Sequence, residues 1–514
     1  MSPGEPAQQA VMDFLADSAS HGGAPVKRID THAASVFLAG DRAIKIKQAV
    51  RFPFLDYSTL EKRKAACEAE IAVNRPFAPA IYHGVVPITR EANGSLAIGG
   101  KGTAVEWVVA MRRFDENLTL DHLAERGEID DGLADRLGRA VASAHTAAPV
   151  VDGFGFAAAL AEIAAQNEAE LKERPDLFAP EKVEALGEAT RAALERVRPL
   201  LEARERAGQV RRCHGDLHLG NIVLLDGEPT LFDAIEFDPK FATSDVFYDL
   251  AFLLMDLIER GLGRAANIVL NRYLNETRRV DDLNALAALP LFLSVRAVVR
   301  AKVTAARAKG HKEHSADRAA AERSARDYFA LAEKLIAPPP PRLVAVGGLS
   351  GTGKSLLARA LALDLAPLPG AVVLRSDVER KALFGVAETE RLPQEAYARD
   401  VSARVYAAIE DKARRVIAAG HSAVADAVFA DTQERTAIAQ AAGGGAFRGL
   451  FLTAPLALRV ARVGSRARDA SDADAAVAQR QEQYDLGALD WDEVDALGTS
   501  AETLARAKKA LGLA

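Results

Sequence analysis

The sequence predicts two folded modules: an α+β module with two lobes, then an α/β module with a parallel sheet. Three observations lead to this expectation. Over residues 1–337, short strand patterns come first and helical patterns follow. Four consecutive prolines then occupy 338–341, and strands alternate with helices over 342–514. Prolines cannot continue a helix and favour an extended spacer, so we place the domain boundary at this linker.

Bulk composition agrees with a multidomain globular protein. A chain of 514 residues exceeds what one core usually organises, and 49% hydrophobic with 26% charged residues is globular composition. The net charge of −6 provides no global basic field for nucleic acid or an anionic membrane. The two cysteines, Cys67 and Cys213, support no disulfide framework and favour a reducing cytoplasm. No secretion signal or apolar run of membrane-spanning length is found, so we expect a cytoplasmic protein without a membrane segment.

The first module divides into a small β-rich lobe, about 1–113, and a helical lobe, about 114–337. Strand patterns cover residues 27–30, 35–39, 43–47 and 105–113, and helical periodicity covers 59–75 and 133–146. A hairpin is predicted over 223–233, because Asp226-Gly227 is a strong turn dipeptide between two apolar runs.

The most informative stretch of the first module is His214-Gly-Asp216-Leu-His-Leu-Gly-Asn221, followed by Asp233 after the predicted hairpin. Phosphoryl transfer to a hydroxyl needs a carboxylate near the hydroxyl proton and oxygen ligands for magnesium. Asp216, Asn221 and Asp233 supply these groups. The alternative is that they are turn residues and helix caps, but three such groups at this spacing favour a site.

This stretch resembles the aminoglycoside phosphotransferase and choline-kinase-like branch of the protein-kinase fold, with the motif H-G-D-x-x-x-x-N. The resemblance implies a bilobal protein-kinase-like fold for the first module. It also implies Asp216 as the catalytic base, Asn221 and Asp233 as magnesium ligands, and Asp249 as the acid that braces the catalytic loop.

The same resemblance assigns nucleotide-binding groups in the small lobe. Lys45 would bind phosphate and Glu70 would pair with it, although strand alternation puts Lys47 on the same face as a competitor. The alternative is that these charges form a solvent-exposed ion pair with no role in nucleotide binding. Met111 would lie at the hinge beside the purine. The loop 31–35 departs from the glycine-rich pattern of protein kinases, which leaves the choice between ATP and GTP open.

The second module begins with a phosphate-binding motif. Gly348-Leu-Ser-Gly-Thr-Gly-Lys354-Ser355 matches G-x-x-x-x-G-K-[ST], follows a predicted strand and opens a predicted helix. This context predicts a P-loop NTPase fold, in which backbone N–H groups and the helix N-terminus surround phosphates. Lys354 would contact the β- and γ-phosphates, and Ser355 would contact magnesium. The expected nucleotide-binding residues are Gly348, Ser350, Gly351, Thr352, Gly353, Lys354 and Ser355.

Two carboxylates and an arginine segment complete the second predicted site. Asp377 and Asp426 each end a predicted strand, at the sheet edge where ligands of parallel sheets bind. The module resembles P-loop kinases of the gluconate, shikimate and polynucleotide-kinase type. That resemblance implies Asp377 as the base, Asp426 as a magnesium ligand through water, and Arg462 and Arg466 as lid arginines. Helix capping by Asp377, a polar strand-end role for Asp426 and a solvated arginine face are the alternatives.

We therefore expect a phosphotransferase that uses ATP and Mg²⁺, with small-molecule hydroxyl acceptors at one or both sites. Two rival functions remain at this stage. One module could sense nucleotide and regulate the other, or the P-loop half could be a nucleic-acid-end or toxin-like kinase. The acidic net charge and the lack of a basic, aromatic-studded groove weigh against a nucleic-acid partner. The acceptor, the coupling of the sites and the oligomeric state stay open.

Overall fold

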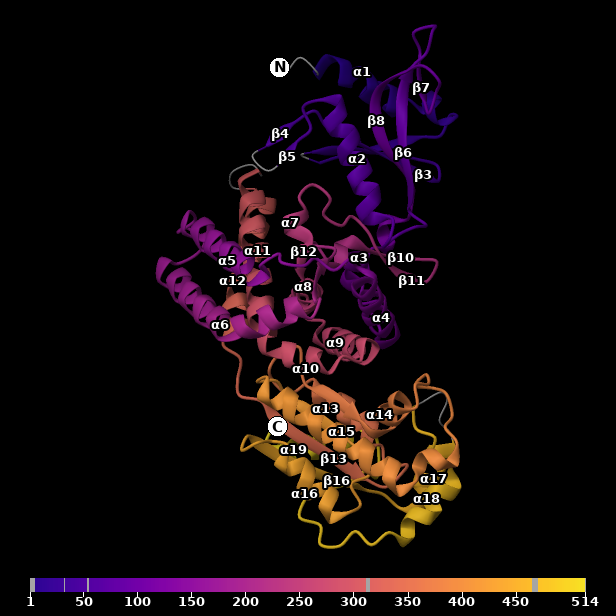
Figure 1. Ribbon diagram of the computed structural model, residues 1–514, viewed down its shortest axis with the longest axis vertical. Helices are drawn as coiled ribbons and strands as arrows, with labels where there is room; N and C mark the ends of the chain where they lie inside the picture. The colour runs from indigo at the N-terminus through magenta and orange to yellow at the C-terminus, as the bar shows by residue number, and fades with distance from the viewer. Residues whose placement is uncertain (1–4, 32, 53–54, 311–314, 465–469, 514) are drawn as a thin grey trace. The chain divides into compact units, whose positions relative to one another are not determined.

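The computed structural model describes residues 5–31, 33–52, 55–310, 315–464 and 470–513 (Figure 1). The chain forms two compact units. Unit 1 comprises Met1–Phe156 and Leu201–Asp256, and unit 2 comprises Ala157–Leu200 and Leu257–Ala514. The domain boundary at the proline linker, 338–341, stays a prediction.

Unit 1 begins with an antiparallel sheet in the strand order β1-β2-β3-β8-β6-β7. The strands are β1 Val26–Asp30, β2 Ala34–Ala39, β3 Arg42–Lys47, β6 Tyr82–Arg90, β7 Leu96–Ile98 and β8 Thr103–Arg112. The strands predicted at 27–30, 35–39, 43–47 and 105–113 are confirmed. Strand β6 is not anticipated by the sequence pattern because it contains Gly84 and Pro87, residue types that are depleted in strands.

Helices α1 (Glu5–Ala16) and α2 (Leu60–Asn74) pack on opposite faces of this sheet. Leu15 of α1 shares a buried cluster with Ile44 of β3. Cys67 of α2 shares a different cluster with Val109 of β8, which pairs with Lys45. Successive side chains of a strand point to opposite faces, so Lys45 lies on the α2 face.

The rest of unit 1 is mainly helical and carries two short strand pairs. A two-residue turn at Asp226-Gly227 joins β10 and β11 in the register Leu225↔Glu228, and both turn residues have positive φ. The predicted hairpin is therefore confirmed. The remaining elements of unit 1 are η1 Ser18–His21, β4 Arg51–Phe52, β5 Leu55–Asp56, η2 Glu116–Leu118, α3 Leu120–Glu125, α4 Asp131–Ala147, β9 Val210–Arg212, η3 Leu219–Asn221, β10 Ile222–Leu225, β11 Glu228–Leu231, α7 Pro239–Ala242, β12 Thr243–Asp245 and most of α8 Val246–Glu259.

Unit 2 opens with a helical part in which α11 packs along α12. Its helices are α5 Phe156–Lys172, α6 Pro180–Arg206, α9 Gly263–Thr277, α10 Val280–Ala285, η4 Leu286–Ala288, α11 Leu289–Gly310 and α12 Ala316–Ile336, with the first residue of α5 and the end of α6 in unit 1. One described stretch, Val280–Gly310, is apolar and long enough to cross a membrane by composition. Because 78% of its most apolar window is buried inside the protein, it has the character of a core helix.

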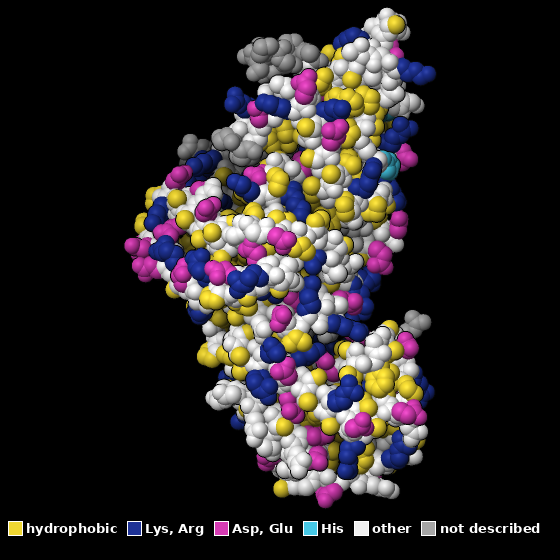
Figure 2. Space-filling model, viewed as in Figure 1, with side chains coloured by type: hydrophobic (Ala, Val, Ile, Leu, Met, Phe, Trp, Pro, Cys, Tyr) yellow, Lys and Arg dark blue, Asp and Glu magenta, His cyan; other side chains and the backbone are white. Residues whose placement is uncertain are grey.

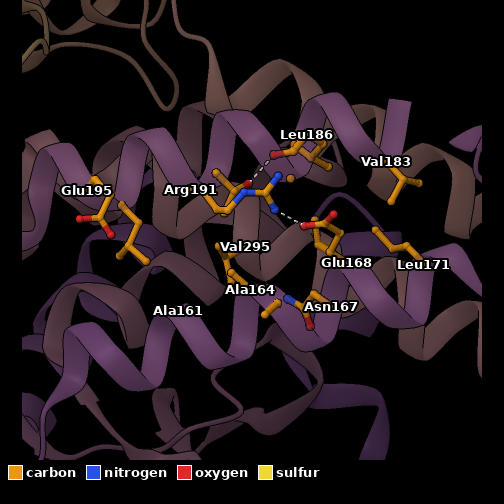
Figure 3. A pocket seen from close by; sticks show the side chains of 15 residues that line it. Ala161, Ala164, Asn167, Glu168, Leu171, Val183, Leu186, Arg191, Glu195 and Val295 are labelled. Carbon is orange, nitrogen blue, oxygen red and sulfur yellow. Dashed lines mark hydrogen bonds and ion pairs between the residues drawn. The ribbon is translucent and has the colours of Figure 1, made fainter. Parts of the chain in front are cut away.

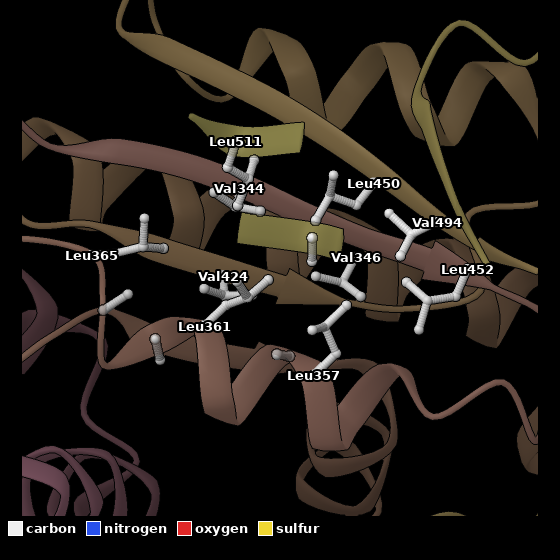
Figure 4. Close-up of a cluster of buried hydrophobic side chains, with 14 of the residues drawn as sticks. Val344, Val346, Leu357, Leu361, Leu365, Val424, Leu450, Leu452, Val494 and Leu511 are labelled. Carbon is white, nitrogen blue, oxygen red and sulfur yellow. The ribbon is translucent and has the colours of Figure 1, made fainter. Parts of the chain in front are cut away.

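The second part of unit 2 is a parallel sheet in the order β14-β15-β13-β16-β17, covered by helices. Figure 4 shows Val344 and Val346 of β13 packed with Leu357 and Leu361 of α13. The sequence pattern predicts strands at 343–347, 372–376, 422–427 and 448–452, and all four are confirmed. The fifth, β17, has the acidic sequence Asp-Glu-Val-Asp at a sheet edge and carries no apolar run. The elements are β13 Arg342–Gly348, α13 Lys354–Ala362, β14 Val372–Arg375, α14 Ser376–Leu383, η5 Gln394–Tyr397, α15 Arg399–Ala418, β15 Ala423–Asp426, α16 Thr432–Gln440, β16 Ala446–Thr453, α17 Leu456–Gly464, α18 Ala475–Arg480, η6 Gln481–Gln483, β17 Asp492–Asp495 and α19 Ser500–Leu511.

Two asparagines of α9 bind the backbone at edge strand β14. Asn267 and Asn271 each donate a side-chain hydrogen bond to the Ala371 carbonyl, at 3.1 and 3.2 Å. The Val373 N–H donates to Asn271 Oδ1 at 2.8 Å. An edge strand otherwise offers open backbone groups to other chains. Helix α9 therefore covers part of this edge within unit 2.

Candidate functional site

The first candidate site is built on the loop between β9 and β10. Asn221 donates its side-chain N–H to the Asp216 carbonyl at 2.9 Å and to Asp216 Oδ2 at 3.0 Å. His218 caps the short helix η3 and its Nε2 lies 3.4 Å from Asp216 Oδ2. Because the Asn221 nitrogen is engaged, its amide oxygen is the atom that can bind a cation. The predicted base and a predicted magnesium ligand are thus in direct contact.

A buried carboxylate holds the start of this loop. Asp249 accepts hydrogen bonds from the His214 N–H at 3.2 Å and the Gly215 N–H at 2.8 Å, and lies 3.1 Å from His145 Nε2. Gly215 has φ +86°, and an added Cβ would lie 2.9 Å from the Ala242 side chain. The loop therefore requires a glycine there, and Asp249 contacts the loop as the family resemblance implies.

Removing the Asp249 carboxylate should destabilise unit 1. We expect Asp249→Ala to lower the free energy of unfolding by about 2–5 kcal/mol, because two buried backbone N–H groups lose their acceptor. Asp249→Asn keeps one acceptor oxygen and should lose less. Urea unfolding followed by tryptophan fluorescence measures both. An unchanged midpoint for Asp249→Ala would show that the carboxylate does not support the loop.

The hairpin brings Asp233 beside the loop. The Phe232 N–H donates to the Asn221 carbonyl at 2.9 Å, so the residue that precedes Asp233 is bonded to the other predicted metal ligand. Asp233 has φ +59°, a sparsely populated conformation for a non-glycine residue. Its N–H donates to the Tyr82 hydroxyl at 3.1 Å, which supports this strained backbone.

Asn74 of α2 fixes the residue after Asp233. The Ala234 N–H donates to Asn74 Oδ1 at 2.7 Å, and Asn74 Nδ2 donates to the Ala234 carbonyl at 3.3 Å. Asn74 is fully buried. This two-way contact ties the segment of the predicted metal ligand to the helix that carries Glu70.

Lys45 and Lys47 share the Glu70 carboxylate. Glu70 Oε1 lies 2.9 Å from Lys45 Nζ, and Oε2 lies 2.6 Å from Lys47 Nζ. Lys45 also lies 2.9 Å from Asp233 Oδ1, whereas Lys47 pairs with Glu236. Burial alone would raise the pKa of the Glu70 carboxyl, but the two lysine charges lower it to about 2. Lys45 is the lysine that contacts the predicted magnesium ligand, and Lys47 belongs to a more buried ion pair.

The predicted hinge lies at the end of β8. The Met111 side chain belongs to the cluster that contains Val109 and Tyr82. The next two N–H groups are already used, because Arg112 N donates to the Ile81 carbonyl and Arg113 N to the Asp41 carbonyl, each at 2.8 Å. The backbone contact of Met111 with a purine stays a prediction.

The second candidate site is the loop between β13 and α13. Gly348, Gly351 and Gly353 all have positive φ, which the turn requires. A Cβ on Gly351 would lie 2.4 Å from the Arg459 carbonyl. Lys354, the first residue of α13, donates to the Leu349 carbonyl at 3.2 Å, so its ammonium is folded over the loop. Ser350, Thr352 and Ser355 lie in the same loop or at the helix start.

Strand register places three charged side chains near the carboxyl end of the sheet. Asp426 pairs with Val346 of β13 and with Arg375 of β14, and Arg375 Nε lies 3.4 Å from Asp426 Oδ2. Asp377 follows β14 in the first turn of α14. Burial and the Asp426 charge raise the pKa of the Asp377 carboxyl, against the opposing charges of Arg375 and Lys354. Asp377 is therefore close enough to Asp426, Arg375 and Lys354 for their charges to act on its carboxyl.

The predicted lid arginines are only partly described. Arg462 of α17 donates to the Ala496 carbonyl at 2.9 Å and the Thr352 carbonyl at 3.4 Å. Arg459, one turn earlier, donates to the Ser350 carbonyl at 3.3 Å. Both arginines thus contact the backbone of the phosphate-binding loop. Arg466 lies outside the described residues.

Several side chains at these sites were not expected from the sequence. Neither Asn74 nor Tyr82 belongs to a motif, and each contacts Asp233 or its neighbour only through the fold. Asp256 accepts the Leu219 N–H of the loop between β9 and β10 at 2.9 Å. In the second site, Gln481 accepts the Ser350 N–H at 2.6 Å. Arg375 lies two residues before Asp377 in the sequence, and this position is the signal that could have pointed to it as a site residue.

Comparison with curated proteins identifies the family. Proteins of Mycobacterium bovis and Mycobacterium tuberculosis, described as uncharacterized, are 32% identical over 479 residues, which cover 89% of this chain and 90% of theirs. The chain belongs to their family. Within this family member, residues 55–283 match the phosphotransferase enzyme family and residues 343–485 match the AAA domain.

Two solved structures are similar to parts of this family member. A choline/ethanolamine kinase family protein from Mesorhizobium loti is 16% identical, with 64% of this chain and 95% of that chain covered and a TM-score of 0.39. A gluconokinase from Sinorhizobium meliloti is 20% identical, with 34% and 92% covered and a TM-score of 0.25.

The matched families confirm the predicted fold class, with a kinase-like first module and a P-loop second module. They make this family member a phosphotransferase. ATP dependence is implied by both folds.

Proposed function

We propose that the first site transfers the γ-phosphate of ATP to a hydroxyl group of a small molecule. The contact between Asp216 and Asn221, with Asp233 joined to Asn221 through the hairpin, is the observation that carries this proposal. Asp216 acts as the base that accepts the hydroxyl proton. Asn221 and Asp233 offer the hard oxygen atoms that Mg²⁺ prefers, and a bound Mg²⁺ would neutralise charge on the β- and γ-phosphates.

The lysine pair prepares the same site for phosphate. Lys45 lies between Glu70 and Asp233, within 3 Å of each, which fixes its ammonium beside the metal ligands. The charges of Asp233 and Glu70 raise its pKa against the opposing effect of burial, so the side chain stays cationic. A fixed cation of this kind stabilises the anionic phosphates without rearranging during the reaction. Lys47 keeps Glu70 oriented from its other oxygen.

The P-loop site is proposed to be a second phosphotransferase centre, which makes the protein bifunctional. The backbone of Gly348–Ser355 holds the phosphates, with Lys354 on the transferred group and Ser355 with Asp426 on Mg²⁺. Asp377 is the base for the acceptor hydroxyl, and Arg462 and Arg466 stabilise charge on the phosphoryl group. The close electrostatic coupling of Asp377 with Asp426 and Lys354 supports this assignment.

The base role of Asp377 predicts a pH dependence. Only the ionised carboxylate can act as a base, and it becomes protonated as the pH falls through its pKa. Because the pKa of Asp377 is raised, activity should begin to fall at a higher pH, on lowering the pH, than it would with an ordinary aspartate. Arg375→Gln removes a charge that lowers the pKa, so the acid limb of kcat/KM should move further upward. Arg448→Gln, on an exposed arginine paired with Asp492, is the matched control. An acid limb that does not respond to Arg375→Gln would contradict the assignment.

The acceptors can be found with purified protein, γ-labelled ATP and a cell metabolite extract resolved by chromatography. Two sets of labelled products are expected, one lost in Asp216→Asn and the other in Lys354→Ala. If either substitution removes every product, one module regulates the other and bifunctionality is wrong.

Labelled oligonucleotide in a parallel reaction tests a nucleic-acid acceptor, which we do not expect. Figure 2 shows Lys and Arg interspersed with Asp and Glu over the visible face, without a continuous basic band. The free, buried cysteines fit the cytoplasm, which we propose as the location.

A further inference from the structure

A cavity lies among α5, α6 and α11 in the helical part of unit 2. Its volume is about 330 Å³, within the range of small-molecule sites. Figure 3 shows Ala161 and Ala164 of α5, Leu186 of α6 and Val295 of α11 around it, and most of its lining is alanine, leucine and valine. None of its lining residues belongs to either candidate nucleotide site.

One polar side chain in this cavity is buried without a partner. Asn167 of α5 lines the cavity and is 3% exposed. Among the described residues, neither its amide nitrogen nor its amide oxygen has a hydrogen-bond partner. Buried polar groups are almost always paired, because an unpaired amide loses its bonds to water and gains nothing in return. Asn167 therefore needs a partner that the described part of the chain does not supply.

Water is a poor candidate for that partner. An ordered buried water needs two to four polar contacts, and a large apolar cavity holds water weakly. The Thr190 hydroxyl, which also lines the cavity, donates its one proton to the Leu186 carbonyl at 2.7 Å and has none left to donate to a water. The cavity volume also exceeds the space of one water about tenfold. An apolar molecule with one hydrogen-bonding group matches both the walls and the amide.

The mouth of the cavity is built from charged side chains. Arg191 of α6 pairs with Glu168 of α5, and Lys172 lies 2.7 Å from the same carboxylate (Figure 3 draws the first pair). Gly187 makes room for this ion pair, because a Cβ there would lie 2.4 Å from Glu168 Oε2. Arg191 and the nearby Glu195 are exposed. The cavity thus has an apolar interior and an entrance at the surface.

We propose that this cavity is a binding site for a small uncharged molecule with an apolar body and a carboxamide-like group. A carboxamide both donates and accepts, so it can satisfy both ends of the Asn167 amide at once. Each charge at the mouth has an opposite partner, because Arg191 and Lys172 share Glu168 and Glu195 pairs with Arg198, so no lone charge is left for an ionic ligand. The site is independent of the proposed phosphotransfer chemistry.

Two matched probes test the proposal on the full-length protein. 4-Fluorobenzamide carries the amide, and 1-fluoro-4-isopropenylbenzene is its hydrocarbon isostere; ¹⁹F NMR titration measures binding of each. The wild type should bind the amide roughly tenfold more tightly than the hydrocarbon, and Asn167→Leu should reverse that order. Ala164→Leu fills the cavity and should weaken both probes. Ala169→Leu, on the exposed face of α5, is the control and should change neither.

Stability provides an independent readout. Removing an unpaired buried amide should stabilise the protein, so Asn167→Leu should raise Tm by about 2–4 °C. A lower Tm would mean that Asn167 already has a partner in solution, and the proposal would fall. It would fall equally if the wild type bound neither probe at millimolar concentration, or if Asn167→Leu kept the wild-type preference.

Discussion

Replacing Asp216 by asparagine is expected to lower phosphoryl transfer at the first site by about 10²–10⁴-fold. The substitution keeps the shape of the side chain but removes the carboxylate that we propose as the acceptor of the hydroxyl proton. Asn221 can still donate to the Asp216 backbone carbonyl, so the loop should keep its conformation. The loss should therefore appear in kcat, while nucleotide affinity changes little. Initial rates with the acceptor found in the metabolite screen measure the effect.

Asp226→Asn is the matched control for this substitution. Asp226 lies in the turn of the β10–β11 hairpin, which follows the loop that carries Asp216; it is 72% exposed at its side chain and pairs with Arg112 at the surface. Its replacement should leave the rate within twofold, because exposed ion pairs contribute only about 0–1 kcal/mol. A rate for Asp216→Asn close to that of this control would remove Asp216 from the chemistry.

Lys354→Ala is expected to lower transfer at the P-loop site by at least about 10²-fold, and to weaken nucleotide binding there as well. The ammonium lies at the start of α13 and is held over the loop by the Leu349 carbonyl, from which it can move to the phosphates. Without this cation, the negative charge of the phosphates is less well compensated, both in the bound nucleotide and in the transition state of transfer. Transfer measured in the Asp216→Asn background isolates this site.

Lys508→Ala serves as the comparison for this second substitution. Lys508 is a partly exposed lysine of α19 that pairs with Asp364 at 2.7 Å. Its removal deletes the same charge without touching the phosphate loop. If both lysine substitutions reduced transfer to the same extent, the effect of Lys354→Ala would be one of net charge and not of phosphate binding.

The local parts of both sites could be predicted from the sequence. The turn at Asp226-Gly227 and the three glycines of the P-loop depend on backbone conformations that few residue types adopt, so a short pattern is enough to locate them. The alternation in β3 likewise placed Lys45 and Lys47 on one face, and the structure brings both to Glu70. Which of the two binds phosphate could not be resolved in that way.

The supporting contacts could not be predicted, because they join residues far apart in the chain. Asn74 and Tyr82 meet the Asp233 segment only after the small-lobe sheet and α2 have formed. Strand β17 could not be predicted for a related reason. Its acidic sequence has no strand pattern, and the strand can be recognised only from its pairing with β16. Local patterns thus indicate the proposed reacting groups, whereas tertiary contacts determine how rigidly those groups are held.

The most direct test of the two-site account is the number of nucleotides that one chain binds. Equilibrium dialysis with a non-hydrolysable ATP analogue and Mg²⁺ should give two per chain for the wild type. Asp233→Ala and Lys354→Ala should each leave one, the double variant none, and a chelator should weaken both sites. A wild-type value of one, or loss of both sites on either single substitution, would contradict the presence of two separate nucleotide–metal centres.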